Sequence, residues 1–305
     1  MTADQLLALV AGILGGALRV GAPFLFVSLG ECITEKAGRI NLGLEGVLVL
    51  SAMCGFGGSY LTGSVWLGVL CAVLAGGALA ALHGVLCSLP RVNDVATGIA
   101  LMLLGTGLAF YLGKPLIQPQ APQLPPIELG NWSSSPAVKA ALQINPLVPL
   151  GLLLAVALWW GFANTRAGLL VRMAGDSAQA ARALGYSVPA IRIAATIAGG
   201  MVAGLGGACL TLFYPGSWNE GISSGQGLIA VALVIFARWS PLRCVGAALL
   251  FGGAGALGPA LQAIGIGWGY HLFNIVPYVL TLLILVLSCK PGQLAAGAPG
   301  EFSAR

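Results

Sequence analysis

The sequence predicts an all-α membrane protein built as a bundle of transmembrane helices. Hydrophobic residues make up 58% of the 305-residue chain and charged residues only 8%. A soluble domain with so few charges could not cover its surface with polar groups. Glycine occurs 46 times, which is typical of transmembrane helices that pack closely. The composition therefore excludes a soluble globular protein, and the scattered basic residues predict no nucleic-acid partner.

Long apolar segments predict where the chain crosses the membrane. A span needs about 20 mostly apolar residues, and about nine segments approach this length, with about eight to ten allowed because glycine-rich runs blur their boundaries. The expected spans are residues 6–29, 42–62, 65–88, 95–112, 147–163, 190–213, 226–237, 242–263 and 272–289. The seventh is too short to cross as a straight helix. We therefore expect a non-helical entry at 216–225, or one half of a broken helix.

The basic residues between the spans predict the orientation. If the loop at 164–189 is cytoplasmic, alternation places the following basic residues on the same side: Lys36, Arg39, Arg91, Arg238, Arg243 and Lys290. The opposite side then holds only Lys114 and Lys139. Loops rich in lysine and arginine stay in the cytoplasm, so the N-terminus is expected outside and the C-terminus inside. Residues 1–290 should form a single membrane domain, followed by a disordered cytoplasmic tail at 291–305.

A long segment, residues 113–146, is expected on the external side. Its prolines exclude a regular helix through the first half, whereas Pro136 can begin a short helix that runs to Leu142. Loops of this length are often functional. Two interpretations remain open for it, a docking surface for an external solute-binding protein and a plain cap over the bundle.

The most polar segment, residues 164–192, lies between two long apolar runs and carries several arginines. It has the pattern of a short capped helix: Asp176 or Ser177 can cap its N-terminus, Ala178–Leu184 follow, and Gly185 supplies a left-handed stop. Pro189 then begins the next helix. A membrane protein that holds a short amphipathic helix in a basic loop presents it to a soluble partner, which we expect to be an ATPase.

Two glycine-rich approaches to apolar helices, residues 39–50 and 221–232, resemble each other. In the expected topology they run in opposite directions, as in the inverted repeats of transporters, where substrates bind at broken helices. A chance match remains the alternative, because the similarity is short and depends on glycine.

Polar residues at membrane depth are costly and usually serve a pathway or a partner. Residues of this kind are the candidates for the substrate pathway, and they are Asn41, Glu45, Asn93, Ser223 and Gln226. For Glu45 the structural alternative is a pair with Arg39 or with a helix end. Asp94 has the pattern of a helix N-cap.

The sequence contains one match to a catalytic motif. Residues 221–225 match G-x-S-x-G, but the strand–turn–helix elbow that this motif requires is not expected here. The chain contains no G-x-x-x-x-G-K-[ST] phosphate loop, no H-E-x-x-H and no His/Cys cluster with metal-ligand spacing. We therefore expect no catalytic residues, no metal and no cofactor in this chain, and any ATP and Mg²⁺ should be bound by separate subunits.

Four stretches carry a family resemblance. Residues 29–52, LGECITEKAGRINLGLEGVLVLSA, resemble the signature of ABC-transporter permeases of the branched-chain amino acid and simple sugar type, nucleoside branch. Residues 91–108, 172–192 and 225–253 are similar to the same branch in the same order. The resemblance covers roughly residues 20–290.

The resemblance implies a permease domain in a bacterial cytoplasmic membrane, paired with a second, homologous but different permease. It also implies two cytoplasmic ATP-binding subunits and an external solute-binding protein. Purine nucleosides are the leading substrates, with simple sugars and branched-chain amino acids as alternatives and a secondary transporter as the rival class. The family's coupling helix matches Gly175, Asp176, Ala180, Ala181, Ala183, Leu184, Gly185 and Tyr186. Asp176 and Ser177 depart from the Glu-Asn that relatives often carry there, which puts the identity of the capping residue in doubt.

Overall fold

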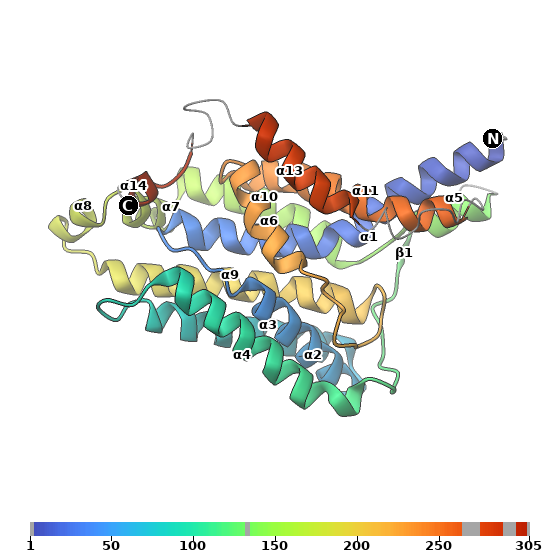
Figure 1. Ribbon diagram of the computed structural model, residues 1–305, viewed down its shortest axis with the longest axis horizontal. Coiled ribbons are helices and arrows are strands. Elements are labelled where there is room, and N and C mark those ends of the chain that lie inside the picture. The colour runs from blue at the N-terminus through green and yellow to red at the C-terminus, as the bar shows by residue number, and fades with distance from the viewer. Residues whose placement is uncertain (1–2, 132–134, 264–274, 289–296, 304–305) are drawn as a thin grey trace.

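The computed structural model describes residues 3–131, 135–263, 275–288 and 297–303, and most of them are helical (Figure 1). The longer helices are α1 (Ala3–Lys36), α2 (Leu44–Thr62), α3 (Val65–Leu86), α4 (Asp94–Gly113), α6 (Leu147–Asn164), α9 (Val188–Leu212) and α11 (Pro241–Ala263). The shorter ones are α5 (Pro136–Ala141), α7 (Arg166–Asp176), α8 (Ala178–Ala183), α10 (Gln226–Phe236), α13 (Val276–Ser288) and α14 (Gly300–Ser303).

Seven helices in the described part of the chain are long and apolar enough to cross a membrane. They coincide with seven of the expected spans. The short seventh span is present as α10, with 11 residues. The ninth, 272–289, overlaps α13, while residues 264–274 lie outside the described residues. The predicted fold class, an all-α polytopic helical bundle, is confirmed.

The two ends of the bundle differ in structure (Figure 1). One end carries α5 and a two-stranded antiparallel sheet of β1 (Ile127–Glu128) and β2 (Gln143–Ile144). Helix α5 begins at Pro136, as expected, and a short 3-10 helix, η1 (Lys114–Leu116), follows α4. The sheet was not predicted, because two-residue strands leave no periodic pattern.

The opposite end, with α7, α8 and α14, corrects two expectations and decides between two candidate cap residues. Residues 164–189 form two helices rather than one, because Thr165 caps α7 by accepting a hydrogen bond from Gly168 N at 3.0 Å. Asp176 is the last residue of α7, and Ser177 is the N-cap of α8. The tail was expected to be disordered, yet its described residues 297–303 include α14.

Glycines allow the central helices to approach closely. A Cβ on Gly200 of α9 would overlap the side chain of Ala80 on α3, and one on Gly207 would lie 2.6 Å from Ala52 N on α2. On the other side of α2, a Cβ on Gly46 would lie 2.8 Å from Met102 Cα on α4. Small residues at such contacts let helix backbones pack together inside a membrane. The resulting core fixes the positions of α2 and α10, which meet at the first candidate site.

Candidate functional site

The first turn of α2 meets the N-terminus of α10 through the carboxylate of Glu45. Ser223 Oγ donates to Glu45 Oε1 at 2.5 Å and Gly225 N donates to the same atom at 3.1 Å. Gly227 N donates to Oε2 at 2.7 Å. The first backbone N–H groups of a helix lack partners within it and carry partial positive charge. Glu45 therefore supplies both an acceptor and a complementary charge to α10, from a helix about 180 positions away in the sequence.

Two glycines make this junction sterically feasible. Gly225, the N-cap of α10, has φ +79°, in the left-handed region that favours glycine. A Cβ on Gly227 would lie 2.6 Å from the backbone of Glu45. The segments 39–50 and 221–232, which resemble each other in sequence, are thus in contact in the fold.

Helix α10 is too short to cross a membrane by itself. Eleven residues at about 1.5 Å each make α10 about 16 Å long, which is half of the roughly 30 Å hydrocarbon core. Beyond the other end of α10, the Trp239 indole N–H donates to Glu35 Oε2, one residue before the end of α1. Helix α10 is therefore a half-length helix, and its N-terminus meets the first turn of α2.

Asn41 shapes the connector between α1 and α2. Its side-chain Oδ1 accepts a hydrogen bond from Gly43 N at 2.9 Å, and its backbone N donates to Glu31 Oε1 at 2.8 Å. Asn41 is 1% exposed. It holds the turn from which Glu45 projects.

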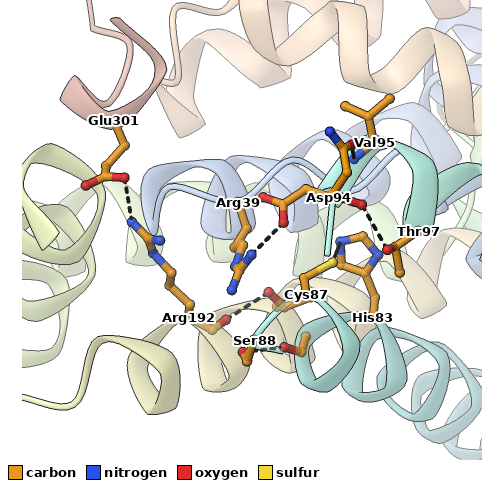
Figure 2. A network of polar contacts seen from close by, with 12 residues as sticks. Arg39, His83, Cys87, Ser88, Asp94, Val95, Thr97, Arg192 and Glu301 are labelled. Atoms are coloured by element: carbon orange, nitrogen blue, oxygen red, sulfur yellow. Dashed lines mark hydrogen bonds and ion pairs between the residues drawn. The ribbon is translucent and has the colours of Figure 1, made fainter. Parts of the chain in front are cut away.

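A buried ion pair ties the same connector to α4 (Figure 2). Arg39 Nη1 lies 2.5 Å from Asp94 Oδ1, with the two residues 8% and 3% exposed. The N-cap of α4 is Asn93, whose side chain accepts hydrogen bonds from Val95 N and Ala96 N, so the expectation that Asp94 is the cap was wrong. Arg39 pairs with Asp94 and not with Glu45. The two structural alternatives for Glu45 were a pair with Arg39 and a contact with a helix end, and the structure shows the contact with a helix end.

The neighbouring histidine and cysteine form a separate contact. Cys87 Sγ lies 3.6 Å from His83 Nε2 (Figure 2). Burial raises the pKa of the Cys87 thiol to about 11, and the Asp94 charge adds to the rise. The thiol therefore stays protonated at neutral pH and acts as a small apolar group.

Helices α7 and α8 form the second candidate site, an exposed face at one end of the bundle. Ser177 Oγ accepts a bond from Ala180 N at 3.2 Å, and Gly185 has φ +83°, as expected for the end of this helix. Leu184 and Tyr186 are 67% and 45% exposed. Large apolar side chains at the tip of a polar loop are typical of a protein contact.

Comparison with known proteins identifies the chain. The family model for the permease component of branched-chain amino acid transport systems matches residues 9–287. The chain belongs to this permease family. Such a permease is a membrane-embedded ABC transporter subunit, generally non-catalytic, and ATP hydrolysis lies with other subunits.

The permease is similar to proteins named for two kinds of substrate. A candidate glucose ABC transporter permease of Haloferax volcanii, TsgC13, is 36% identical, with 84% of this chain and 79% of the relative covered. The nucleoside ABC transporter permease NupC of Lactococcus lactis is 28% identical, over 90% of this chain and 91% of the relative. The guanosine ABC transporter permease NupQ of Bacillus subtilis is 27% identical, over 90% of each.

A solved structure supports the fold of the permease. It is an inward-facing conformation of a candidate metal-chelate type ABC transporter, with a TM-score of 0.52 and 15% identity, covering 91% of this chain and 85% of that one.

The permease brings together only some of the residues expected to line the pathway. Ser223 contacts Glu45, and Gln226 lies in the first turn of α10 beside them. Asn41 lies in the connector just before the helix that carries Glu45. Asn93 is elsewhere, at the N-terminus of α4, and its pathway role stays a prediction. Within the G-x-S-x-G match at 221–225, the Ser223 hydroxyl donates to the Glu45 carboxylate.

The residues expected to couple the permease to an ATPase divide into two groups. Gly175 and Ala181 are buried, and Ala181 packs in a small apolar cluster with Val188. The others are exposed at the surface: Asp176, Ala180, Ala183, Leu184, Gly185 and Tyr186. The buried pair therefore supports the helix, while the exposed residues form its free face.

Sequence reasoning missed the contacts that fasten this face to the bundle. Arg192 donates to Ala37 O and to Ala174 O, both at 2.9 Å, and lies 3.3 Å from Glu301 Oε2 of α14 (Figure 2). Glu301 Oε1 also accepts a bond from Ala178 N at 3.1 Å. The available signal was a lone arginine beside an apolar run, which does not identify its partners.

Proposed function

We propose that this permease forms half of the translocation pathway of a binding-protein-dependent ABC importer, with purine nucleosides as the leading substrates. The observation that carries the proposal is the Glu45 junction, where the half-length helix α10 begins. Transporters bind substrates where the ends of discontinuous helices and polar side chains come together. The junction between α2 and α10 combines such a helix end with polar side chains.

Gln226 supplies a feature suited to a polar solute. Its Oε1 atom is buried and accepts no hydrogen bond from the described residues. A buried acceptor without a partner costs about 1–3 kcal/mol. A hydroxyl or amino group of a substrate would satisfy it, so a ribose, a purine amine or a sugar hydroxyl fits this position.

The nucleoside assignment draws on the relatives named for nucleosides and guanosine, which match over nine tenths of the chain. Glucose or another simple sugar is the second candidate, because the relative named for glucose is 36% identical. Both substrate kinds present several hydroxyl groups, so the Glu45 junction alone does not separate them.

The proposed arrangement places the α8 end in the cytoplasm of a bacterial cell, with the permease in the inner membrane, N-terminus out and C-terminus in. The basic residues of α7 and α8, which are Arg166, Arg172 and Arg182, support this, because loops rich in lysine and arginine stay in the cytoplasm. ATP-binding subunits would dock on Leu184 and Tyr186, a second permease would complete the pathway, and a solute-binding protein would deliver substrate at the α5 end. Closure of the ATPase dimer would then move α8 and switch the permease between its two open states.

The test is uptake into proteoliposomes that contain the permease with its partner permease, ATPase and binding protein. We expect ATP-dependent uptake of guanosine, not of glucose, and loss of this uptake when Leu184 and Tyr186 are both replaced by Asp. Leu89→Asp is the matched control, because Leu89 is 52% exposed in the α3–α4 loop, outside α7 and α8. Normal uptake and normal co-purification of the ATPase with the double variant would refute the docking proposal. Uptake of glucose alone would favour the second candidate.

A further inference from the structure

A small pocket of about 220 Å³ lies at the α8 end, where α1, α6 and α7 meet the segment after α10. Its basic lining residues are Lys36, Arg172 and Arg238, and its aromatic ones are Trp159, Phe162 and Trp239. The three basic residues come from α1, α7 and the connector to α11, so the fold alone gathers them. The proposed function gives this pocket no role.

The pocket has an uncompensated positive charge. None of its lining residues is acidic, and no ion pair joins Lys36, Arg172 or Arg238 to a described carboxylate. Arg172 Nε is buried and has no hydrogen-bond partner in the described part of the chain. Glu35, the nearby acid, is 3% exposed and already accepts the Trp239 indole N–H. Like charges this close repel one another unless an anion lies among them.

The aromatic residues place the pocket at the membrane surface. Trp159, near the end of α6, is 49% exposed, and exposed tryptophans concentrate at the level of lipid headgroups. Lys36 Nζ lies 5.5 Å from the centre of the Phe162 ring, at distances typical of a cation–π contact. One wall of the pocket is therefore open to lipid and the other is cationic.

The backbone of the third wall is held in an unusual conformation. Arg238 and Trp239 have φ +50° and +54°, in the left-handed region that non-glycine residues rarely adopt. Successive residues of this kind persist where surrounding structure fixes them, often at ligand clamps. Here the conformation brings both side chains to the same pocket. Its volume is below the roughly 300–1,000 Å³ of sites for drug-sized ligands, which fits a headgroup phosphate better than a whole nucleotide.

We propose that this pocket binds the phosphate headgroup of an anionic phospholipid of the cytoplasmic leaflet. Basic pockets between transmembrane helices on the cytoplasmic side recognise such headgroups. The inference uses the proposed orientation of the permease but not its substrate. Because Arg172 lies on α7, directly before α8, a bound lipid would stabilise the helix that supports the exposed residues Leu184 and Tyr186.

The experiment measures lipid retention by native mass spectrometry of the purified full-length permease, released from nanodiscs of phosphatidylcholine with or without phosphatidylglycerol. It requires no transport, so its outcome is independent of the substrate assignment. Each basic group near an anionic lipid strengthens binding about fivefold, so the double variant Arg172→Gln with Arg238→Gln should bind phosphatidylglycerol about 30-fold more weakly. The matched control replaces Arg166 and Arg243, exposed at the same end and outside the pocket, with Gln.

Four outcomes decide the proposal. Selective retention of phosphatidylglycerol, lost in the double variant and kept in the control, supports it. Equal retention in the double variant and the wild type overturns it. Displacement of the lipid by millimolar inorganic phosphate would show a free-anion site and overturn the lipid assignment. Exclusion of the lipid when the ATPase subunits bind would assign the pocket to a protein contact instead.

Discussion

Removing the charge of Glu45 should weaken the attachment of α10 and slow transport. Glu45→Gln keeps the shape of the side chain but replaces the carboxylate that accepts bonds from Ser223, Gly225 and Gly227. A hydrogen bond to a charged group contributes about 1.5–3 kcal/mol and one between neutral groups about 0.5–1.5 kcal/mol, so each bond loses about 1 kcal/mol. The new amide also carries an NH₂ group, which is a donor and cannot accept the hydrogen bonds that α10 donates.

The expected total is smaller than three times this value. Glu45 is partly exposed, and contributions of neighbouring groups are not additive. We therefore expect a loss of about 2 kcal/mol in the free energy that holds α10 in place. At about 1.4 kcal/mol per tenfold change, this corresponds to roughly a 30-fold change in the equilibrium constant for detachment of α10. Ser223→Ala, which removes one of the three bonds, should cost about 1 kcal/mol.

The assay combines thermal unfolding in detergent with ATP-driven uptake into proteoliposomes at equal amounts of assembled complex. Glu220→Gln is the control, because Glu220 is exposed, precedes the same segment and undergoes the same change in charge. Unfolding and uptake of Glu45→Gln that match those of Glu220→Gln would refute the reasoning. Complete failure to assemble in Glu45→Gln, with Ser223→Ala unaffected, would show that Glu45 serves assembly alone.

Three further predictions concern contacts that fasten the bundle. Arg39→Met leaves Asp94 as a buried charge without its arginine, which should lower the free energy of unfolding by about 3–5 kcal/mol. Adding Asp94→Leu should restore most of this loss. A double variant with no recovery would contradict the inferred Arg39–Asp94 ion pair. Gly200→Leu should lower the unfolding temperature through overlap at the α3–α9 contact, costing about 1–3 kcal/mol, while Gly107→Leu, with open space around it, should not. Glu301→Gln should speed hydrogen exchange of the α8 backbone amides by a few-fold, because a partly exposed ion pair contributes about 0–1 kcal/mol. Unchanged exchange would argue that the C-terminal tail does not stabilise α8.

Much of the fold could be predicted from local sequence, because the bilayer imposes strict local rules. A span must be apolar over about 20 residues, so the long helices are evident from composition alone. Pro136 and Gly185 marked a helix start and a helix end, because each residue type restricts its own backbone. The shortness of α10 was also evident, and with it the expectation of a broken helix. The pairing of β1 with β2 was not, since two residues carry no period.

The identity of the caps shows where local rules end. Asn93 and Asp94 are both good N-cap residues, as are Asp176 and Ser177. The sequence analysis expected Asp94 in the first case and left both residues open in the second, and the fold selected Asn93 and Ser177. Asp94 is bound by Arg39, which reaches it from the α1–α2 connector.

The sequence by itself determined that this chain is a polytopic permease, because both hydropathy and the family motif are properties of contiguous residues. Only the tertiary structure decided that Glu45 caps α10, that Arg192 meets Glu301, and that Lys36, Arg172 and Arg238 share one pocket. These partners are separated by tens of residues to about two hundred residues. No local propensity encodes such a pairing, since it depends on how closely the glycine-lined helices pack and on which buried charges that packing leaves to be satisfied.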